Sequence, residues 1–291
     1  MTIKEIETSS VDEFWDTISP IGSLVKGMQK PVFRGQGDSS WALIPSVLRN
    51  EVSLKYKSKL REYSQTEQIV LFEYLILFNF LSYLDEMGLV IPNDSPEFRR
   101  LMEFDVFSTR YGADGTGWPS KEYFSFLALA QHHGVPTRLL DWSRSPLVAA
   151  YFAASQVLSL EEIPESLAVW IVDSASFYIF EEQLECVSLP GSTSQNLAPQ
   201  KGVFLVQRQQ GSMYRHTPFS PQFLEGSINQ LFEESKGCVA YKVILPAAMA
   251  GELLFRCSKF GFSAATLFPG FDGAAKAALE FKMAKRLAGV L

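Results

Sequence analysis

Apolar residues recur at helical spacing through much of the first half of the chain and predict a series of helices there. The predicted helices are Val11–Ile18, Glu67–Met87, Pro96–Tyr111 and Lys121–His132. The last one precedes Gly134-Val135-Pro136, a combination that ends helices. The most apolar window, Ile69–Leu84, contains Glu73 and Asn79 and is shorter than the ~20 residues that a membrane span needs. It therefore predicts a buried helix.

Short apolar runs typical of strands dominate the second half. The predicted strands are Leu167–Asp173, Gly202–Gln207, Cys238–Leu245 and Phe262–Phe268, with Thr137–Trp142 extended and further helices at Ala247–Phe260 and Gly273–Ala288. Another helix is expected to begin at Pro146 with Ser145 as its N-cap, because the first turn of a helix does not need the N–H that proline lacks. Early helices and late strands, without a regular strand–helix rhythm, favour an α+β fold with a mixed or antiparallel sheet.

Composition narrows the class of protein. The 291 residues are 47% apolar and 20% charged, which is typical of a soluble globular protein. Because no linker, repeat or low-complexity tract divides the sequence, we expect a single domain over residues 1–291. No apolar leader opens it, and the cysteines Cys186, Cys238 and Cys257 are scattered and odd in number, so we expect a cytoplasmic protein.

Charge is unevenly distributed. The net charge of −6 argues against a protein that coats nucleic acid, but the segment from Arg49 to Arg61 carries five cations against Glu51 alone. Such a run is most often a solvated basic face, and the alternative is a patch that follows phosphates. The candidate nucleic-acid contacts are Arg49, Lys55, Lys57, Lys59 and Arg61.

Several common catalytic signatures are missing from the sequence. It contains no GxxxxGK[ST] phosphate loop, no GxSxG nucleophile elbow and no HExxH motif. The histidines His132, His133 and His216 have no Cys or Asp at metal-binding spacing, so no metal site is expected.

Two other segments gather polar residues at expected junctions between strands and helices. In FRGQGDSSW, Arg34 offers a planar fork for phosphate or carboxylate, and Gly35 permits close approach of the backbone. The second segment is QHHGVPTRLLDWSRSP, residues 131–146. It ends at the predicted helix start, where free N–H groups favour an anion.

Each of these residues has a structural alternative. Arg34 could pair with Asp141 or Asp38, His132 could simply end a helix, and Trp142 could belong to the core. The density of polar groups on both segments nevertheless favours a ligand site.

Both segments also resemble a known family. FRGQGDSSWALIPSVLR and QHHGVPTRLLDWSRSPLVAAYFA are similar to the two signature motifs of the FRG domain family, named after Phe-Arg-Gly. PQKGVF (Pro199–Phe204) resembles the family's Gln-x-Gly-x-Phe strand, and TLFPGFDGAAK resembles its closing motif. These core motifs span residues 31–276.

The order of the parts further resembles the ADP-ribosyltransferase fold, particularly toxins that modify nucleic acid. The resemblance implies that NAD is the substrate, that Arg34 holds its ribose or pyrophosphate, and that Gln200 stands where a Glu is expected. Because an amide carries no charge, Asp141, and after it Asp272, are the candidates to stabilise the positive charge that builds on the ribose. The implied catalytic residues are Arg34, Asp141 and Gln200, and the implied cofactor-binding residues are Arg34, Gly35, Gln36, His132, Thr137, Arg138, Asp141, Trp142, Ser143 and Ser145.

Three functions stay open from the sequence. The first is an ADP-ribosyltransferase that modifies nucleic acid or protein as a toxin or antiphage effector, with an antitoxin or a defence-system partner. The second, which the missing Glu favours, is a non-catalytic module that binds a nucleotide. The third is an NAD glycohydrolase, in which water is the acceptor.

Overall fold

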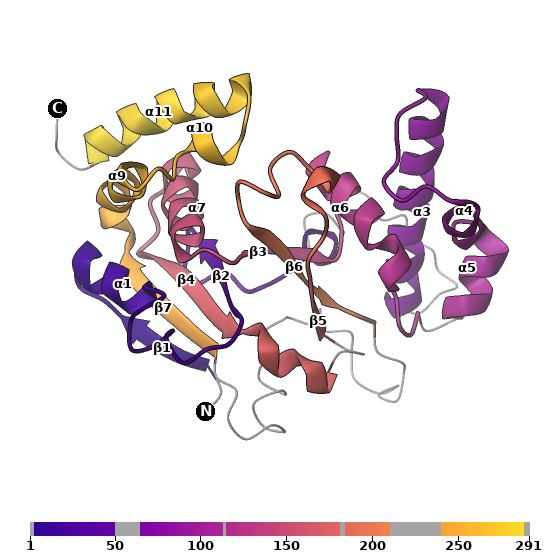
Figure 1. The fold of residues 1–291 in the computed structure, drawn as a ribbon, viewed down its shortest axis with the longest axis horizontal. Coiled ribbons are helices and arrows are strands. Elements are labelled where there is room, and N and C mark those ends of the chain that lie inside the picture. The colour runs from indigo at the N-terminus through magenta and orange to yellow at the C-terminus, as the bar shows by residue number, and fades with distance from the viewer. Residues whose placement is uncertain (1–2, 50–64, 113–114, 181–183, 210–239, 288–291) are drawn as a thin grey trace.

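A seven-stranded sheet forms the centre of the computed structural model, which describes residues 3–49, 65–112, 115–180, 184–209 and 240–287 (Figure 1). The order of the strands is β1-β7-β4-β2-β3-β6-β5. Their bounds are β1 Ile3–Glu7, β2 Pro31–Gln36, β3 Leu139–Ser143, β4 Ser166–Asp173, β5 Leu184–Val187, β6 Gly202–Gln207 and β7 Ala240–Pro246. Strands from both ends of the described chain therefore share one sheet.

The sheet is mixed, and it is nearly split in the middle. β1 and β7 are parallel, whereas all other neighbours are antiparallel. β2 pairs with β4 along its whole length, from Pro31 to Gln36, but with β3 at Phe33 and Ser143 alone. The predicted α+β class with a mixed sheet is thus confirmed, and the sheet opens between β2 and β3.

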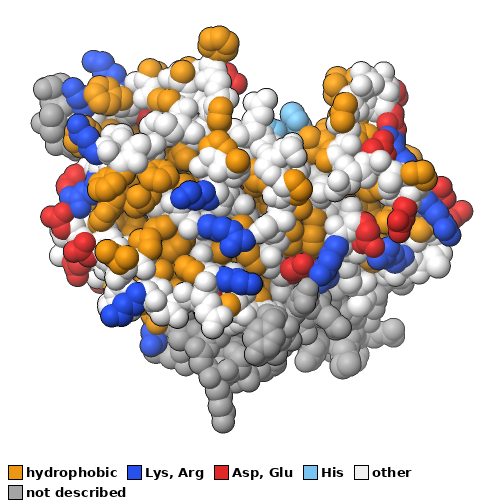
Figure 2. Space-filling view, viewed as in Figure 1, with side chains coloured by type: hydrophobic (Ala, Val, Ile, Leu, Met, Phe, Trp, Pro, Cys, Tyr) orange, Lys and Arg blue, Asp and Glu red, His pale blue; other side chains and the backbone are white. Residues whose placement is uncertain are grey.

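The helices are distributed on either side of this opening (Figure 1). Their bounds are α1 Val11–Ile18, α3 Gln65–Glu86, α4 Pro96–Leu101, α5 Phe104–Tyr111, α6 Phe124–His132, α7 Pro146–Ser159, α9 Ala250–Lys259, α10 Ala264–Leu267 and α11 Phe271–Leu287, with short 3₁₀ turns that include η1 Ser46–Leu48 and η4 Gly191–Thr193. One lobe carries α1, α7, α9, α10 and α11, and the other carries α3 to α6. The space-filling view shows the surface hollowed between the two lobes, with histidine side chains in pale blue at the hollow (Figure 2).

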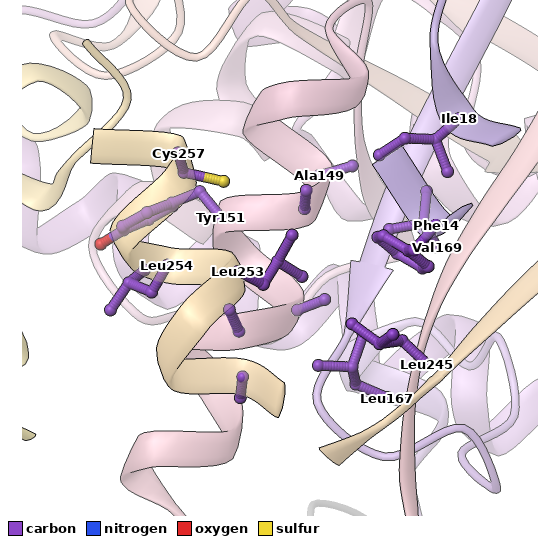
Figure 3. Packing of buried hydrophobic residues seen from close by; sticks show 14 of the residues in the cluster. Phe14, Ile18, Ala149, Tyr151, Leu167, Val169, Leu245, Leu253, Leu254 and Cys257 are labelled. Atoms are coloured by element: carbon purple, nitrogen blue, oxygen red, sulfur yellow. The ribbon is translucent and has the colours of Figure 1, made fainter. Parts of the chain in front are cut away.

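The larger core lies between α7 and one face of the sheet (Figure 3). Phe14 of α1, Val169 of β4 and Leu253 of α9 meet the alanine-rich face of α7 there and are fully buried. The small side chains of α7 allow its backbone to lie close to β2. A Cβ atom added to Gly35 would lie 1.9 Å from the carbonyl oxygen of Ala149, so this packing requires glycine on β2.

A second core, rich in aromatic rings, holds the α3–α6 lobe against β3 and β6. Tyr74 stacks on Phe107 with 4.0 Å between ring centroids, and Trp118 is fully buried beside them. None of the helices in the described ranges is long and apolar enough to span a membrane.

Two predictions about the elements need correction, and two strands were missed. The predicted strand Phe262–Phe268 is wrong, because Ala264–Leu267 forms α10, whose first turn is fixed by the Ser263 N–H donating to Thr266 Oγ1 at 3.0 Å. The single helix predicted for Pro96–Tyr111 is in fact α4 and α5, since the backbone is extended at Glu103. β1 and β5 were not anticipated.

Candidate functional site

A cavity of about 410 Å³ lies where β2 and β3 diverge. β2 and β3 line it together with α6, α7, the segment from η4 to β6, and Phe268 directly after α10. The walls thus come from residues 33–35, 49, 128–156, 194–204 and 268, which are distant from one another in sequence. This volume lies within the range of small-molecule sites.

The guanidinium group of Arg34 lines this cavity and is paired only in part. Its Nη1 donates to the backbone carbonyl of Asp141 at 2.6 Å, while its buried Nε has no hydrogen-bond partner in the described chain. No carboxylate oxygen of a described residue forms an ion pair with it, so the structural alternative of a salt bridge with Asp141 or Asp38 is not realised. Burial lowers the pKa of Arg34 to about 10, against the attraction of Asp141, and the guanidinium stays charged at neutral pH.

Asp141 supplies the one carboxylate among the described residues that line the cavity. Its side chain is open to the cavity, and its Oδ1 accepts a hydrogen bond from Gln131 Nε2 at 2.7 Å. The surrounding protein still removes most of its water. This desolvation raises the pKa of Asp141, while the charge of Arg34 and the hydrogen bond from Gln131 act in the opposite direction.

Arg49 brings a second cation to the same cavity. It follows η1, its Nε donates to the Ile44 carbonyl at 3.2 Å, and its exposed side chain lines the cavity. Its charge contributes to lowering the pKa of both Arg34 and Asp141. With all three groups ionised, the cavity carries a net positive charge and suits an anion. The other residues of the predicted basic patch, Lys55, Lys57, Lys59 and Arg61, lie outside the described residues.

Trp142, Ser143 and Gln200 also line the cavity. The Trp142 ring is nevertheless buried in a core cluster with Leu43 and Trp170, as its structural alternative predicted. Ser143 Oγ donates to the Gln200 carbonyl at 2.7 Å and accepts from the Ser145 N–H at 3.0 Å, so the strand end is tied to the start of α7. Gln200 Nε2 donates to the Leu267 carbonyl at 3.1 Å and connects the turn before β6 to the end of α10. The buried Nε1 of Trp142 has no partner among the described residues.

Thr137 lies behind this cavity and His132 at its edge. Thr137 is fully buried and reaches the cavity through Gln131, whose Oε1 accepts from Thr137 Oγ1 at 2.5 Å. His132 lines the cavity at the end of α6, and its Nδ1 lies 3.0 Å from Ser194 Oγ. Burial and the neighbouring His133 lower the pKa of His132.

Other predicted site residues do not line the cavity. Arg138 is held in the interior by Glu73, with its Nε 2.8 Å from both carboxylate oxygens. Gln36 accepts from Trp170 Nε1 at 2.6 Å and is equally buried. These two side chains serve the fold. Ser145 occupies the N-cap position of α7 and is buried, but its side chain makes no capping hydrogen bond. Asp272, on α11, is exposed outside the cavity.

Gln131, Phe152 and Phe268 are among the cavity residues that were not predicted from the sequence. Gln131 is the first residue of the second polar segment and was passed over beside the two histidines. Phe152 and Phe268 meet edge to face with ring centroids 5.9 Å apart, although they lie on α7 and after α10. Phe268 belongs to the Leu-Phe-Pro of the closing motif, and that motif could have identified it as a candidate site residue. In the described ranges, no group of three His, Cys, Asp or Glu side chains is placed to hold a metal ion.

Part of this site lies in a segment that matches a known family. The model of the FRG domain matches residues 29–162. The chain carries an FRG domain. The match covers Arg34, Arg49, Gln131 and Asp141, so the charged side of the cavity belongs to the FRG domain, whereas Gln200 and Phe268 lie beyond the matched range. Comparisons with curated proteins and with solved structures found no match.

Proposed function

We propose that this protein binds NAD in the cavity between β2 and β3 and transfers its ADP-ribose to an acceptor. The observation that carries the proposal is that Arg34, a cation with an unused buried Nε, and the carboxylate of Asp141 line the same cavity. The guanidinium of Arg34 suits the pyrophosphate of a dinucleotide, and the carboxylate of Asp141 suits a positively charged sugar.

Binding would use the charges and rings that line the cavity. Arg34 and Arg49 together offer a positive field to the pyrophosphate, and Arg34 has a geometry suited to two parallel hydrogen bonds. Phe152 and Phe268 provide aromatic surface for a planar base such as nicotinamide.

The reaction would break the bond between nicotinamide and C1′ of the ribose. Nicotinamide leaves with the bonding electron pair, which neutralises its ring, and C1′ becomes part of an oxocarbenium ion. An acceptor oxygen or nitrogen then bonds to C1′ and loses its proton. Ionised Asp141 can stabilise the sugar cation and accept that proton.

A non-catalytic nucleotide-binding module is the second candidate, and one observation favours it. Gln200 stands where the resemblance places a Glu, and its amide is already used to hold the Leu267 carbonyl. If Asp141 cannot replace the missing charge, the same cavity binds NAD without cleaving it.

As the acceptor we propose nucleic acid, because Arg49 at the cavity begins the basic run that continues to Arg61. A toxin or antiphage role, with an antitoxin or defence partner, belongs to the same proposal and rests on the resemblance alone.

The test uses purified protein, NAD labelled on the adenine phosphate, and separate pools of single-stranded DNA, RNA and lysate protein. We expect label on a nucleic-acid pool and released nicotinamide. Nicotinamide with free ADP-ribose and no labelled pool would identify a glycohydrolase, and NAD binding without turnover would identify the binding module.

Arg34→Ala is the decisive variant. We expect it to weaken NAD binding by at least tenfold, since a charge-assisted hydrogen bond is worth about 1.5–3 kcal/mol, with little change in Tm. Arg144→Ala is the matched control, because Arg144 is an exposed arginine next to β3 that donates to Ser188 outside the cavity. A large drop in Tm together with lost binding would show that Arg34 is structural. Asp141→Asn should keep binding and lose turnover.

A further inference from the structure

We propose that Gln131 is a positioning residue: oriented by Thr137, it holds the Asp141 carboxylate ionised, with one oxygen free to face the cavity. The inference deepens the proposed function and rests on it, because it concerns the group that would stabilise the sugar cation. Gln131 lies in the last turn of α6, one residue before His132, and lines the cavity itself.

The carboxylate is held at one oxygen and open at the other. Gln131 Nε2 donates to Asp141 Oδ1 at 2.7 Å, whereas Oδ2 has no hydrogen-bond partner among the described residues. Since the side chain is exposed to the cavity, Oδ2 is the oxygen available to a ligand. The hydrogen bond at Oδ1 therefore sets the direction in which Oδ2 points.

Thr137 fixes which end of the Gln131 amide faces Asp141. Thr137 Oγ1 accepts from the Leu139 N–H at 3.1 Å and donates its own proton to Gln131 Oε1 at 2.5 Å. With Oε1 occupied in this way, Nε2 is the end that reaches the carboxylate. The reversed amide would place Oε1 against the ionised Oδ1 with no proton between them, which is repulsive.

Thr137 itself is immobilised by the protein. It is 1% exposed, its N–H donates to Ser46 Oγ at 3.0 Å, and its carbonyl accepts from the same hydroxyl at 3.2 Å. The series of hydrogen bonds from Ser46 through Thr137 and Gln131 to Asp141 thus begins in the protein interior and ends at the ligand cavity.

The groups around Asp141 favour different ionisation states of its carboxyl, and the hydrogen bond from Gln131 adds to those that favour the ionised state. Arg34 from β2 and Arg49 after η1 favour the ionised carboxylate, whereas desolvation, the largest influence, favours the neutral acid. His132 on α6 lines the same cavity, and its burial favours the uncharged ring. A donor at Oδ1 stabilises the ionised form, so its removal moves the ionisation of Asp141 to higher pH.

The experiment measures this ionisation directly, by a ¹³C NMR titration of the Asp141 carboxyl carbon, assigned with Asp141→Asn. We expect Gln131→Ala to move the midpoint upward by about one pH unit and Thr137→Val to move it in the same direction. Thr137→Ser keeps the hydroxyl and should titrate as the wild type does. Gln195→Ala, which removes an exposed glutamine outside the cavity, is the control.

The pH profile of turnover should follow the titration. In Gln131→Ala the acidic limb of kcat should move to higher pH by the same amount, because Asp141 must be ionised to act, while the Kd for NAD stays within about twofold. An unchanged midpoint in Gln131→Ala overturns the inference, as does equal weakening of NAD binding and turnover with no shift.

Failure of the proposed enzyme activity gives a different result from failure of the inference about Gln131. If the wild type releases no nicotinamide under any condition, the proposed enzyme activity fails, and the carboxyl titration still decides whether Gln131 holds Asp141 ionised.

Discussion

Replacing Gly35 with alanine tests how the fold and the cavity depend on each other. The added Cβ would lie 1.9 Å from the Ala149 carbonyl oxygen and 2.7 Å from the Ala153 nitrogen. Both are backbone atoms of α7, so no side chain can rotate away. β2 and α7 would have to separate by about 1 Å or more to restore ordinary van der Waals distances.

The free energy of unfolding should fall by about 3 kcal/mol. Overpacking a core costs about 1–3 kcal/mol, and a clash between two backbones belongs at the upper end of that range. For a chain of this size, such a loss lowers Tm by roughly 6–12 °C. Ligand binding should weaken as well, because Ala149 and Phe152 on α7 are walls of the cavity.

Urea denaturation followed by circular dichroism gives the free energy, and Gly27→Ala is the matched control. Nothing lies within 4 Å of a Cβ atom at Gly27, and its backbone is not in the left-handed region. We therefore expect the free energy of unfolding to rise by about 0.5–1 kcal/mol in Gly27→Ala. A Gly35→Ala variant within 1 kcal/mol of the wild type would refute the argument that β2 and α7 are in backbone contact.

Two further substitutions separate structural residues from ligand-binding ones. Arg138→Met should cost about 3–5 kcal/mol, because it leaves the buried Glu73 carboxylate without its cation, although the N–H of Trp118 still donates to it. The double variant with Glu73→Leu should recover part of that loss in the same denaturation assay, and unchanged stability with lost NAD binding would contradict this. Gln200→Glu should lower the free energy of unfolding by about 1–3 kcal/mol, since a carboxylate cannot donate to the Leu267 carbonyl, and a wild-type Tm would show that this hydrogen bond is unimportant.

Local signals predicted much of the fold. The start of α7 at Pro146, with Ser145 before it, depends on neighbouring residues and was correct. The apolar pattern likewise located β4 and β6. The strand predicted for Phe262–Phe268 was wrong for an equally local reason. Its apolar residues suit a strand, but Ser263 and Thr266 hydrogen-bond to the backbone and start a helix.

Elements that depend on distant partners could not be predicted. β1 has a weak strand pattern and exists because it pairs in parallel with β7, more than 230 residues later. The near-split between β2 and β3, which creates the cavity, is a property of pairing that neither strand shows alone.

The same division applies to the candidate site. The sequence alone determined that Arg34 and the segment from Gln131 to Pro146 carry unusual polar density, and it identified the FRG motifs. It could not separate Arg34 from Arg138, because residue type and spacing do not show that Glu73, 65 positions from Arg138, neutralises one arginine and leaves the other facing a cavity. Whether a buried charge supports the fold or awaits a ligand depends on the groups around it, and in this protein the folding of distant segments brings those groups together.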